Sequence, residues 1–256
     1  MLQHELWKRT GYLNKDIEYL FNCSIREYDL KAADMSLMKE FKLVSADTIA
    51  SLEKMDNQAR HVRTGMMQKD KQFAKVLTEA FKEARRMFFE ANEVEEQEVL
   101  SIKKDAIFII NKDCVHHTFG ALDFRIKNQY LGYMYLNRNE FYYTDPQTPI
   151  DVKGLGKSAP EKHREYLLDF FRDVFSYRIY NSYPEQLQLL SSFIKAYRNR
   201  ELAIGYYRQL DNQSYFRLED NGEEILIDGV EEEAIDQLDI RYNYSNYLVP
   251  LISYFI

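Results

Sequence analysis

The order of hydrophobic and polar positions along the chain predicts a mixed α/β protein. Residues 5–22 have the spacing of a helix, and the next segment, CSIREYDL (23–30), has the composition of a short strand with Asp29 at its end. Helical spacing returns in MSLMKEF (35–41) and TIASLEKM (48–55). The first part of the chain is therefore expected to run helix, strand, helix, helix.

Residues 58–91 form the clearest long helical stretch, since they contain no proline and Gly65 is their only glycine. The apolar positions recur at three-, four- and seven-residue steps, which places them on one helix face: Met66, Phe73, Leu77, Phe81, Ala84 and Phe88. A second face carries the basic residues Lys71, Lys75, Lys82 and Arg86. The pattern predicts one amphipathic helix with a basic stripe.

The pattern changes at Val99, where residues 99–111 have two β-rich flanks around a polar centre. Such a segment predicts a β-hairpin, with Asp105 at or near its turn. Further short strands are expected before the turn-forming Pro146 and Pro149, over residues 119–124, 130–136 and 139–144. The middle of the chain should therefore form an antiparallel sheet, backed by the helices that precede it.

Helical spacing returns in residues 160–177 and 184–199, so we place a domain boundary near residue 150. The first domain would cover residues 1–150, and a mostly helical C-terminal part would cover 151–256. The chain ends in an acidic segment and in an uncharged stretch from Tyr242. We expect this tail to pack on the body or on another protein, because large apolar patches rarely remain exposed.

Composition is that of a globular protein: 45% of the 256 residues are hydrophobic and 29% are charged. No apolar run reaches the roughly 18–20 residues that span a bilayer, and the N-terminus lacks the order of a signal peptide. Cys23 and Cys114 are too few for a disulfide framework. We therefore expect a soluble, cytoplasmic protein with reduced thiols and no membrane partner.

The net charge of −7, taken alone, argues against a nucleic-acid partner, but the negative charge is concentrated in one segment. Residues 219–239 hold ten Asp and Glu and no Lys or Arg. Since these ten negative charges exceed the net charge of the whole chain, the remaining residues are mildly basic. A body that binds nucleic acid remains compatible with the composition.

Asp29 and Asp105 are the candidate catalytic residues. Two-metal phosphoryl transfer needs carboxylates from separate strands to meet at one point, because the paired ions contact both the attacking and the leaving oxygen. An aspartate at a strand end and another at a hairpin turn supply this arrangement. A helix with a lysine stripe lies between them in the sequence and could place a cation over a triphosphate.

These residues resemble the palm and fingers motifs of family A and family B DNA polymerases, in the same order. EYDLKAADMSLMKEF (27–41) looks like motif A, QFAKVLTEAF (72–81) resembles motif B, and LSIKKDAIFII (100–110) is similar to motif C. KNQYLGYMYLNRNEFYY (127–143), followed by IDVKGLG (150–156), resembles the strands and the Lys-Gly element that follow motif C in family B. The resemblance covers roughly residues 25–156.

The resemblance implies a palm-like sheet, an inserted basic fingers helix and nucleotidyl transfer to a primer 3′ end. It implies two Mg²⁺ or Mn²⁺ ions on Asp29 and Asp105, with Lys75, and Lys71 beside it, on the nucleoside triphosphate. Asp34 would contact the nucleotide sugar, and Lys153 would lie near the primer or template backbone. Other replication proteins are possible partners, and the choice between DNA and RNA stays open.

Departures from the motifs keep a second interpretation open. Lys103 and Lys104 precede Asp105, where family B has an additional acidic residue and family A a histidine, and Ala106 replaces the glutamate of family A. Cations at this position compete with metals for the carboxylate. The alternative is a catalytically degenerate palm-like protein that binds nucleic acid or a replication partner. A purely structural interaction protein is a third reading.

Two smaller groups of residues complete the candidates. Tyr206, Tyr207 and Arg208 combine aromatic rings with a cation, so they could stack on bases of a nucleic acid. The group from Asp113 to His117 has metal-ligand types, but strand alternation would send His116 and His117 to opposite faces. We do not expect zinc there. Each aspartate also has an ordinary structural interpretation as a helix cap or turn residue.

Overall fold

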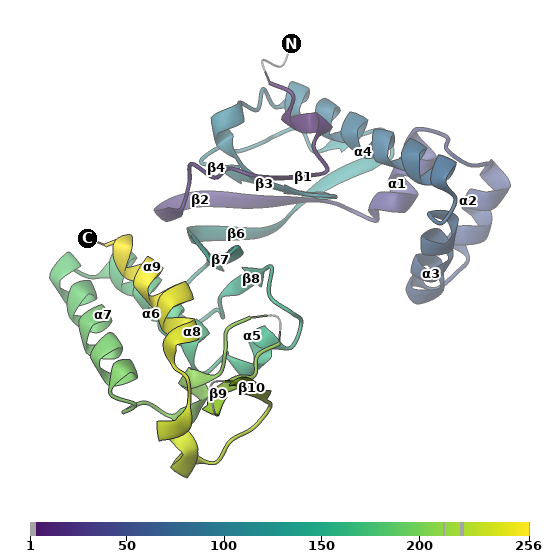
Figure 1. Ribbon diagram of the computed structural model, residues 1–256. Helices are drawn as coiled ribbons and strands as arrows, with labels where there is room; N and C mark the ends of the chain where they lie inside the picture. Colours follow the sequence, from purple (N-terminus) through teal and green to yellow (C-terminus); the bar gives the residue numbers. More distant parts are fainter. Residues whose placement is uncertain (1–3, 212, 221–222, 256) are drawn as a thin grey trace. The chain divides into compact units, whose positions relative to one another are not determined.

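The computed structural model describes residues 4–211, 213–220 and 223–255, and it is a mixed α/β structure with antiparallel sheets and several helices (Figure 1). The chain forms two compact units. The first contains the residues up to 16 and 24–129, and the second contains 17–23 and the residues from 130 onward. The division falls inside strand β6 (Leu122–Leu136), which continues without a turn from one unit into the other. It does not fall near residue 150, where the sequence predicted the boundary.

The sheet of the first unit has the strand order β1-β3-β4-β2-β6. The predicted hairpin over 99–111 is present: β3 and β4 pair antiparallel with Lys103 opposite Ala106, so Lys104 and Asp105 form its turn. Strand β2 pairs antiparallel with β4, and Asp29 lies one residue before its end. The strands are β1 (Gly11–Leu13), β2 (Tyr19–Leu30), β3 (Val99–Lys103), β4 (Ala106–Ile110) and β5 (Thr118–Phe119), which pairs with β6.

The predicted helix over residues 5–22 is wrong. This segment contains only a 3-10 turn, η1 (Leu6–Lys8), followed by β1 and the first residues of β2. Gly11, Tyr12 and Leu13 pair with Lys103, Ile102 and Ser101 at the edge of the sheet. Pairing with a strand almost ninety residues later overrides the weak local helical spacing, as tertiary context commonly does.

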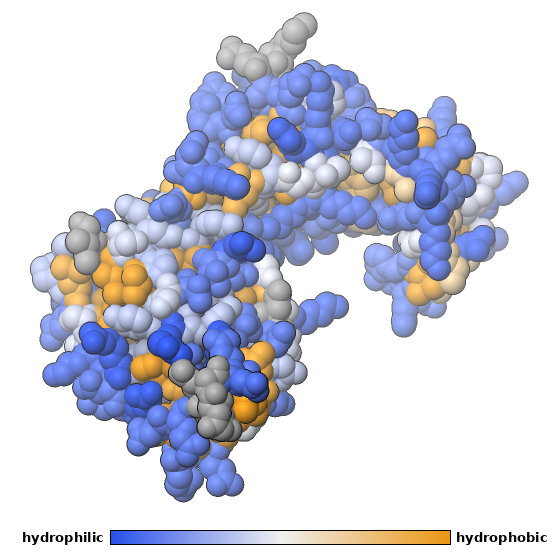
Figure 2. Space-filling model, in the orientation of Figure 1, coloured by the Kyte–Doolittle hydropathy of each residue, from blue (hydrophilic) through white to orange (hydrophobic). Residues whose placement is uncertain are grey.

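Four helices follow β2: α1 (Ala33–Glu40), α2 (Ala46–Glu53), α3 (Asn57–Met67) and α4 (Lys71–Ala91). Helices α1 and α2 confirm the helical segments predicted over 35–41 and 48–55, whereas α3 and α4 replace the single long helix predicted over 58–91. The break has a local cause. The Asp70 side chain accepts hydrogen bonds from the backbone N–H groups of Gln72 and Phe73 at 2.8 and 3.3 Å, so Asp70 is the N-cap of α4. Met66, predicted on the buried face, is consequently 53% exposed on α3. Figure 2 shows hydrophobic surface near the end of this helix.

Helix α4 covers one face of the first sheet (Figure 1). Phe88 is fully buried, and its ring lies 5.1 Å from that of Tyr28 on β2 and 4.7 Å from that of Phe124 on β6. Leu77, Phe81 and Ala84 belong to the same core. The predicted apolar face thus holds from residue 73 onward, and it fixes α4 over β6 and over β2, the strand that carries Asp29.

The second unit places helices around strands β6, β7 and β8, and it also contains a separate β9–β10 hairpin. The uncharged tail packs as predicted, since Tyr247, Leu248 and Leu251 are fully buried in its core. No helix of the described residues is long and apolar enough to cross a bilayer. The elements are β7 (Asn139–Tyr143), β8 (Asp151–Lys153), α5 (Ala159–Lys162), α6 (Leu167–Tyr180), α7 (Tyr183–Arg198), η3 (Ile204–Tyr207), β9 (Phe216–Asp220), β10 (Glu223–Ile227), η4 (Glu232–Gln237), α8 (Arg241–Asn243), η5 (Tyr244–Leu248) and α9 (Val249–Ser253).

Candidate active site

Asp29 and Asp105 line one pocket of about 430 Å³ in the first unit. The strand register explains how they meet. Asp29 on β2 stands opposite Ala106 on β4, and the backbone N–H of Leu30 donates to the carbonyl oxygen of Asp105 at 3.0 Å. The end of one strand and the turn of the neighbouring hairpin are therefore joined directly, as the sequence predicted for these two positions.

A buried arginine on α4, Arg85, hydrogen-bonds to the hairpin turn that carries Asp105. Lys104 adopts the left-handed conformation (φ 49°), and its backbone N–H donates to the carbonyl oxygen of Thr10. Arg85 donates from Nη1 to the Lys104 carbonyl oxygen at 2.6 Å and from Nε to the Trp7 carbonyl oxygen at 3.1 Å. Arg85 is only 2% exposed, and burial lowers its pKa to about 10. The turn that carries Asp105 thus has a fixed support.

The two carboxylates have different electrostatic surroundings. Burial raises the pKa of Asp105, and the negative charge of Asp29 raises it further. Asp29, in contrast, has a cation near each oxygen: Arg125 Nη2 lies 3.3 Å from Oδ2 and Lys127 Nζ lies 3.9 Å from Oδ1. Both cations come from β6. Two carboxylates that repel each other in one pocket are a donor set that a divalent cation stabilises.

Asp34 also lines this pocket, from the first turn of α1. Its carboxylate is engaged at both oxygens: Oδ2 accepts from Gln68 Nε2 at 3.0 Å, and Oδ1 lies 3.8 Å from Lys104 Nζ. Asp34 therefore connects the C-terminal end of α3 with the hairpin turn. The side chain retains 22% exposure toward the pocket.

The cations nearest the carboxylates are not the predicted lysines. Lys71 and Lys75 lie exposed on the first two turns of α4, and neither lines the pocket. Arg60 and His61 on α3 do line it. Farther along the predicted stripe, Lys82 pairs with Glu79, and Arg86 pairs with Glu83 and Glu90, so these charges are neutralised within the helix.

Sequence reasoning missed Arg60 because residues 58–91 were treated as one helix. The capping aspartates would have indicated two helices: Asp56 accepts from the Ala59 N–H at the start of α3, and Asp70 does the same for α4. Arg125 was missed for another reason. It stands on a strand with no local motif, and only the pairing of β2 with β6 brings it to Asp29.

The family described as Bacteriophage PBS1 gene 130 protein matches residues 1–256. The chain belongs to this family. No curated protein matches the sequence.

The PBS1 gene 130 family name designates a bacteriophage gene product and gives no activity. Among the described residues, no group of three or more His, Cys, Asp or Glu side chains lies close enough to hold a metal ion. Three aspartates line the pocket described above: Asp29, Asp34 and Asp105. At the histidine-rich segment, both ring nitrogens of His117 face backbone carbonyl oxygens, those of Phe124 and Cys114.

The predicted nucleic-acid contacts of the second unit serve mainly in packing. Tyr207 is 1% exposed, so its ring is not available for stacking on a base. Tyr206 is half-buried, and its ring packs edge-on against those of Tyr166 and Phe193 at 5.3 and 5.5 Å. Lys153 on β8 pairs with Asp151 at 2.8 Å and is 24% exposed.

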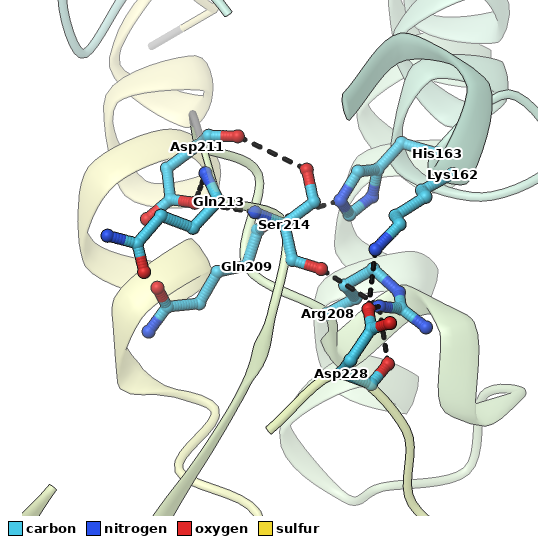
Figure 3. Close-up of polar contacts among 8 residues, drawn as sticks. All are labelled: Lys162, His163, Arg208, Gln209, Asp211, Gln213, Ser214 and Asp228. Atoms are coloured by element: carbon cyan, nitrogen blue, oxygen red, sulfur yellow. Dashed lines mark hydrogen bonds and ion pairs between the residues drawn. The ribbon is translucent and has the colours of Figure 1, made fainter. Parts of the chain in front are cut away.

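Arg208 belongs to a polar network that orders the loop before β9 (Figure 3). Its guanidinium donates to the carbonyl oxygens of Ser214 and Asp228 at 2.9 and 2.7 Å, and Asp228 also pairs with Lys162. Arg208 also lies 4.4 Å from the centre of the Phe216 ring. Its charge is thus already engaged within the unit, which leaves the first unit as the stronger candidate for a site.

Proposed function

We propose that this protein carries out template-directed nucleotidyl transfer to a primer 3′ end, with Asp29 and Asp105 as the catalytic carboxylates. The observation that carries the proposal is that both residues line one pocket, although the α-helical segment from α1 to α4 separates them in the sequence. The order of strand-end aspartate, helices and hairpin-turn aspartate supports a palm-like arrangement.

Asp29 and Asp105 would hold Mg²⁺ or Mn²⁺, which would stabilise charge on the attacking and leaving oxygens. The chain's own groups complete the environment. Arg60 and His61 on α3, which line the same pocket, would supply hydrogen-bond donors. Arg125 and Lys127 supply exposed positive charge along β6, where a phosphate backbone could lie.

Primer extension tests this function directly. The full chain would be incubated with a labelled primer annealed to a longer template, all four nucleotides and either Mg²⁺ or Mn²⁺, with separate DNA and RNA templates. Addition of nucleotides in the order that the template dictates is the expected result. No extension on any template, with either metal, would contradict the proposal.

Arg60→Ala is expected to raise the nucleotide KM about tenfold or more, because a charge-assisted hydrogen bond to a phosphate contributes about 1.5–3 kcal/mol. Lys75→Ala should raise the KM and lower kcat by smaller factors, since Lys75 lies outside the pocket. Arg63→Ala is the matched control, because Arg63 is exposed on the same helix. Single-nucleotide incorporation kinetics measure all three; equal KM values for Arg60→Ala and Arg63→Ala would remove Arg60 from the site.

Asp34→Ala is expected to increase ribonucleotide use relative to deoxynucleotide use, if the carboxylate excludes a 2′-hydroxyl. The ratio of dNTP to NTP incorporation measures this selectivity. Gln68→Ala is the control, because it breaks the Gln68–Asp34 hydrogen bond and keeps the carboxylate. An unchanged ratio together with reduced thermal stability in Asp34→Ala would make Asp34 a structural connection only.

The alternative, a catalytically degenerate palm-like protein that binds nucleic acid, has one observation in its favour. Arg125 and Lys127 already pair with Asp29. Under this alternative, fluorescence anisotropy would detect binding of the primer–template, and Asp105→Asn would leave that binding unchanged while no extension occurs in any metal.

A further inference from the structure

The polar environment of Asp29 contains two exposed cations over a mostly buried carboxylate. The side chain of Asp29 is 14% exposed, whereas those of Arg125 and Lys127 are 55% and 46% exposed. Arg125 contacts Oδ2 and Lys127 lies near Oδ1, so each carboxylate oxygen faces a positive charge. The same oxygens are the ones that a metal ion would need.

Lys127 and Arg125 differ in the number of carboxylates that they contact. Lys127 also lies 3.5 Å from Oε1 of Glu27, a side chain that is only 3% exposed, and this second partner retains it on β6. Arg125 lines the pocket, and the polar contact that the structure gives it within the described residues is the one to Asp29. Arg125 is therefore the cation that can leave Asp29 most easily.

An exposed arginine has two competing partners here. Pairing with Asp29 places a positive charge beside the carboxylate and weakens its attraction for a divalent cation, because like charges repel at this distance. A phosphate group binds guanidinium bidentately and more strongly than a single carboxylate contact at 3.3 Å. Bound nucleic acid would therefore draw Arg125 away from Asp29.

We propose that Arg125 is a latch that couples nucleic-acid binding to divalent-cation binding: without nucleic acid it pairs with Asp29, and a phosphate of the nucleic acid releases it. This inference rests on the proposed function of Asp29 as a metal ligand. Its consequence is that Oδ2 of the Asp29 carboxylate loses its competing cation on the substrate complex. Linkage is reciprocal, so the metal must also tighten nucleic-acid binding by the same factor.

Titration of the full chain with MnCl₂ tests the latch, because the electron paramagnetic resonance signal of free Mn²⁺ reports binding without any turnover. The titration would be run with and without a short primer–template duplex. Asp29→Asn in the presence of duplex gives the Mn²⁺ that the duplex itself binds, which is subtracted. Arg9→Gln is the matched control, since Arg9 is exposed in the same unit and does not line the pocket.

Two results are expected. Arg125→Gln should bind Mn²⁺ about three- to fivefold more tightly than the parent in the absence of duplex, as removal of one exposed ion pair allows. Duplex should tighten Mn²⁺ binding about fivefold or more in the parent and in Arg9→Gln. In Arg125→Gln the duplex should tighten it by less than twofold.

The outcomes separate the latch from the proposed function. Equal Mn²⁺ affinities of the parent and Arg125→Gln, with the same effect of duplex on both, would overturn the latch while leaving Asp29 as a metal ligand. If the parent binds no more Mn²⁺ than Asp29→Asn, with and without duplex, the metal site itself is absent, and the latch falls with the proposed function.

Discussion

Asp105→Asn is expected to reduce primer extension about a thousandfold or more while leaving the thermal stability of the protein unchanged or higher. The loss of activity follows from removing one of the two carboxylates that would hold the metal ions, which in turn would stabilise charge in the transition state. The effect on stability follows from the pKa of Asp105, which burial and the neighbouring Asp29 raise above its ordinary value of 3.8.

Proton linkage determines whether Asp105→Asn raises or lowers the stability of the protein. A raised pKa means that the folded protein holds the Asp105 proton more tightly than the unfolded chain does. The ionised carboxylate therefore costs folding free energy at neutral pH, and this cost disappears as the pH falls below 3.8. Asparagine does not ionise, so Asp105→Asn removes this cost at pH 7. The melting temperature of the variant should therefore not fall below that of the parent.

Asp29→Asn should lose activity to a similar degree but should not gain stability, because it also removes the charge that pairs with Arg125 and Lys127. The cations of these pairs are exposed, and ion pairs at the surface contribute about 0–1 kcal/mol. Single-turnover extension kinetics and thermal unfolding at pH 7 measure both variants. Substantial extension by either variant would show that these aspartates are turn and strand-end residues without a catalytic role.

Arg85→Met is expected to have the second largest effect, a loss of about 2–4 kcal/mol of folding free energy. The change removes two part-buried hydrogen bonds from a charged donor, to the carbonyl oxygens of Trp7 and Lys104, and such bonds contribute about 1.5–3 kcal/mol each. Part of this loss is offset, because methionine avoids burying a charge. Since Arg85 supports the turn before Asp105, extension should also fall.

Arg86→Met is the control for this prediction. Arg86 is adjacent in the sequence, but it pairs with Glu83 and Glu90 on the outer face of α4, so its loss should cost about 1 kcal/mol or less. Urea unfolding of both variants gives the comparison. Equal midpoints for the two variants would mean that Arg85 does not support the hairpin turn.

The sequence allowed prediction of those parts of the site that depend on local pattern. The two β-rich flanks around Asp105 predict a hairpin, and the strand composition of residues 23–30 predicts a strand with Asp29 at its end; both elements are present. The buried face of α4 follows from its helical period, as Phe81 and Phe88 confirm. These features depend on neighbours that are close in the sequence.

The remaining features depend on partners far away in the sequence, where no local pattern exists. Arg125 meets Asp29 only through the arrangement of β2 beside β6, and Gly11–Leu13 becomes a strand only by pairing with β3. Tyr207 was a candidate because aromatic rings beside an arginine suggest base stacking, yet its ring fills the core. Burial of a single aromatic residue follows from tertiary packing, which residue type alone does not determine.

Anomalous X-ray scattering from Mn²⁺ tests the central claim most directly. Crystals of the full chain with a primer–template, an incoming non-hydrolysable nucleotide and Mn²⁺ would be measured at the manganese edge. The account predicts anomalous density between Asp29 and Asp105, with their carboxyl groups roughly 4–6 Å apart, as ligands of paired metals must converge. Carboxyl groups more than about 10 Å apart, or manganese bound only elsewhere, would contradict it.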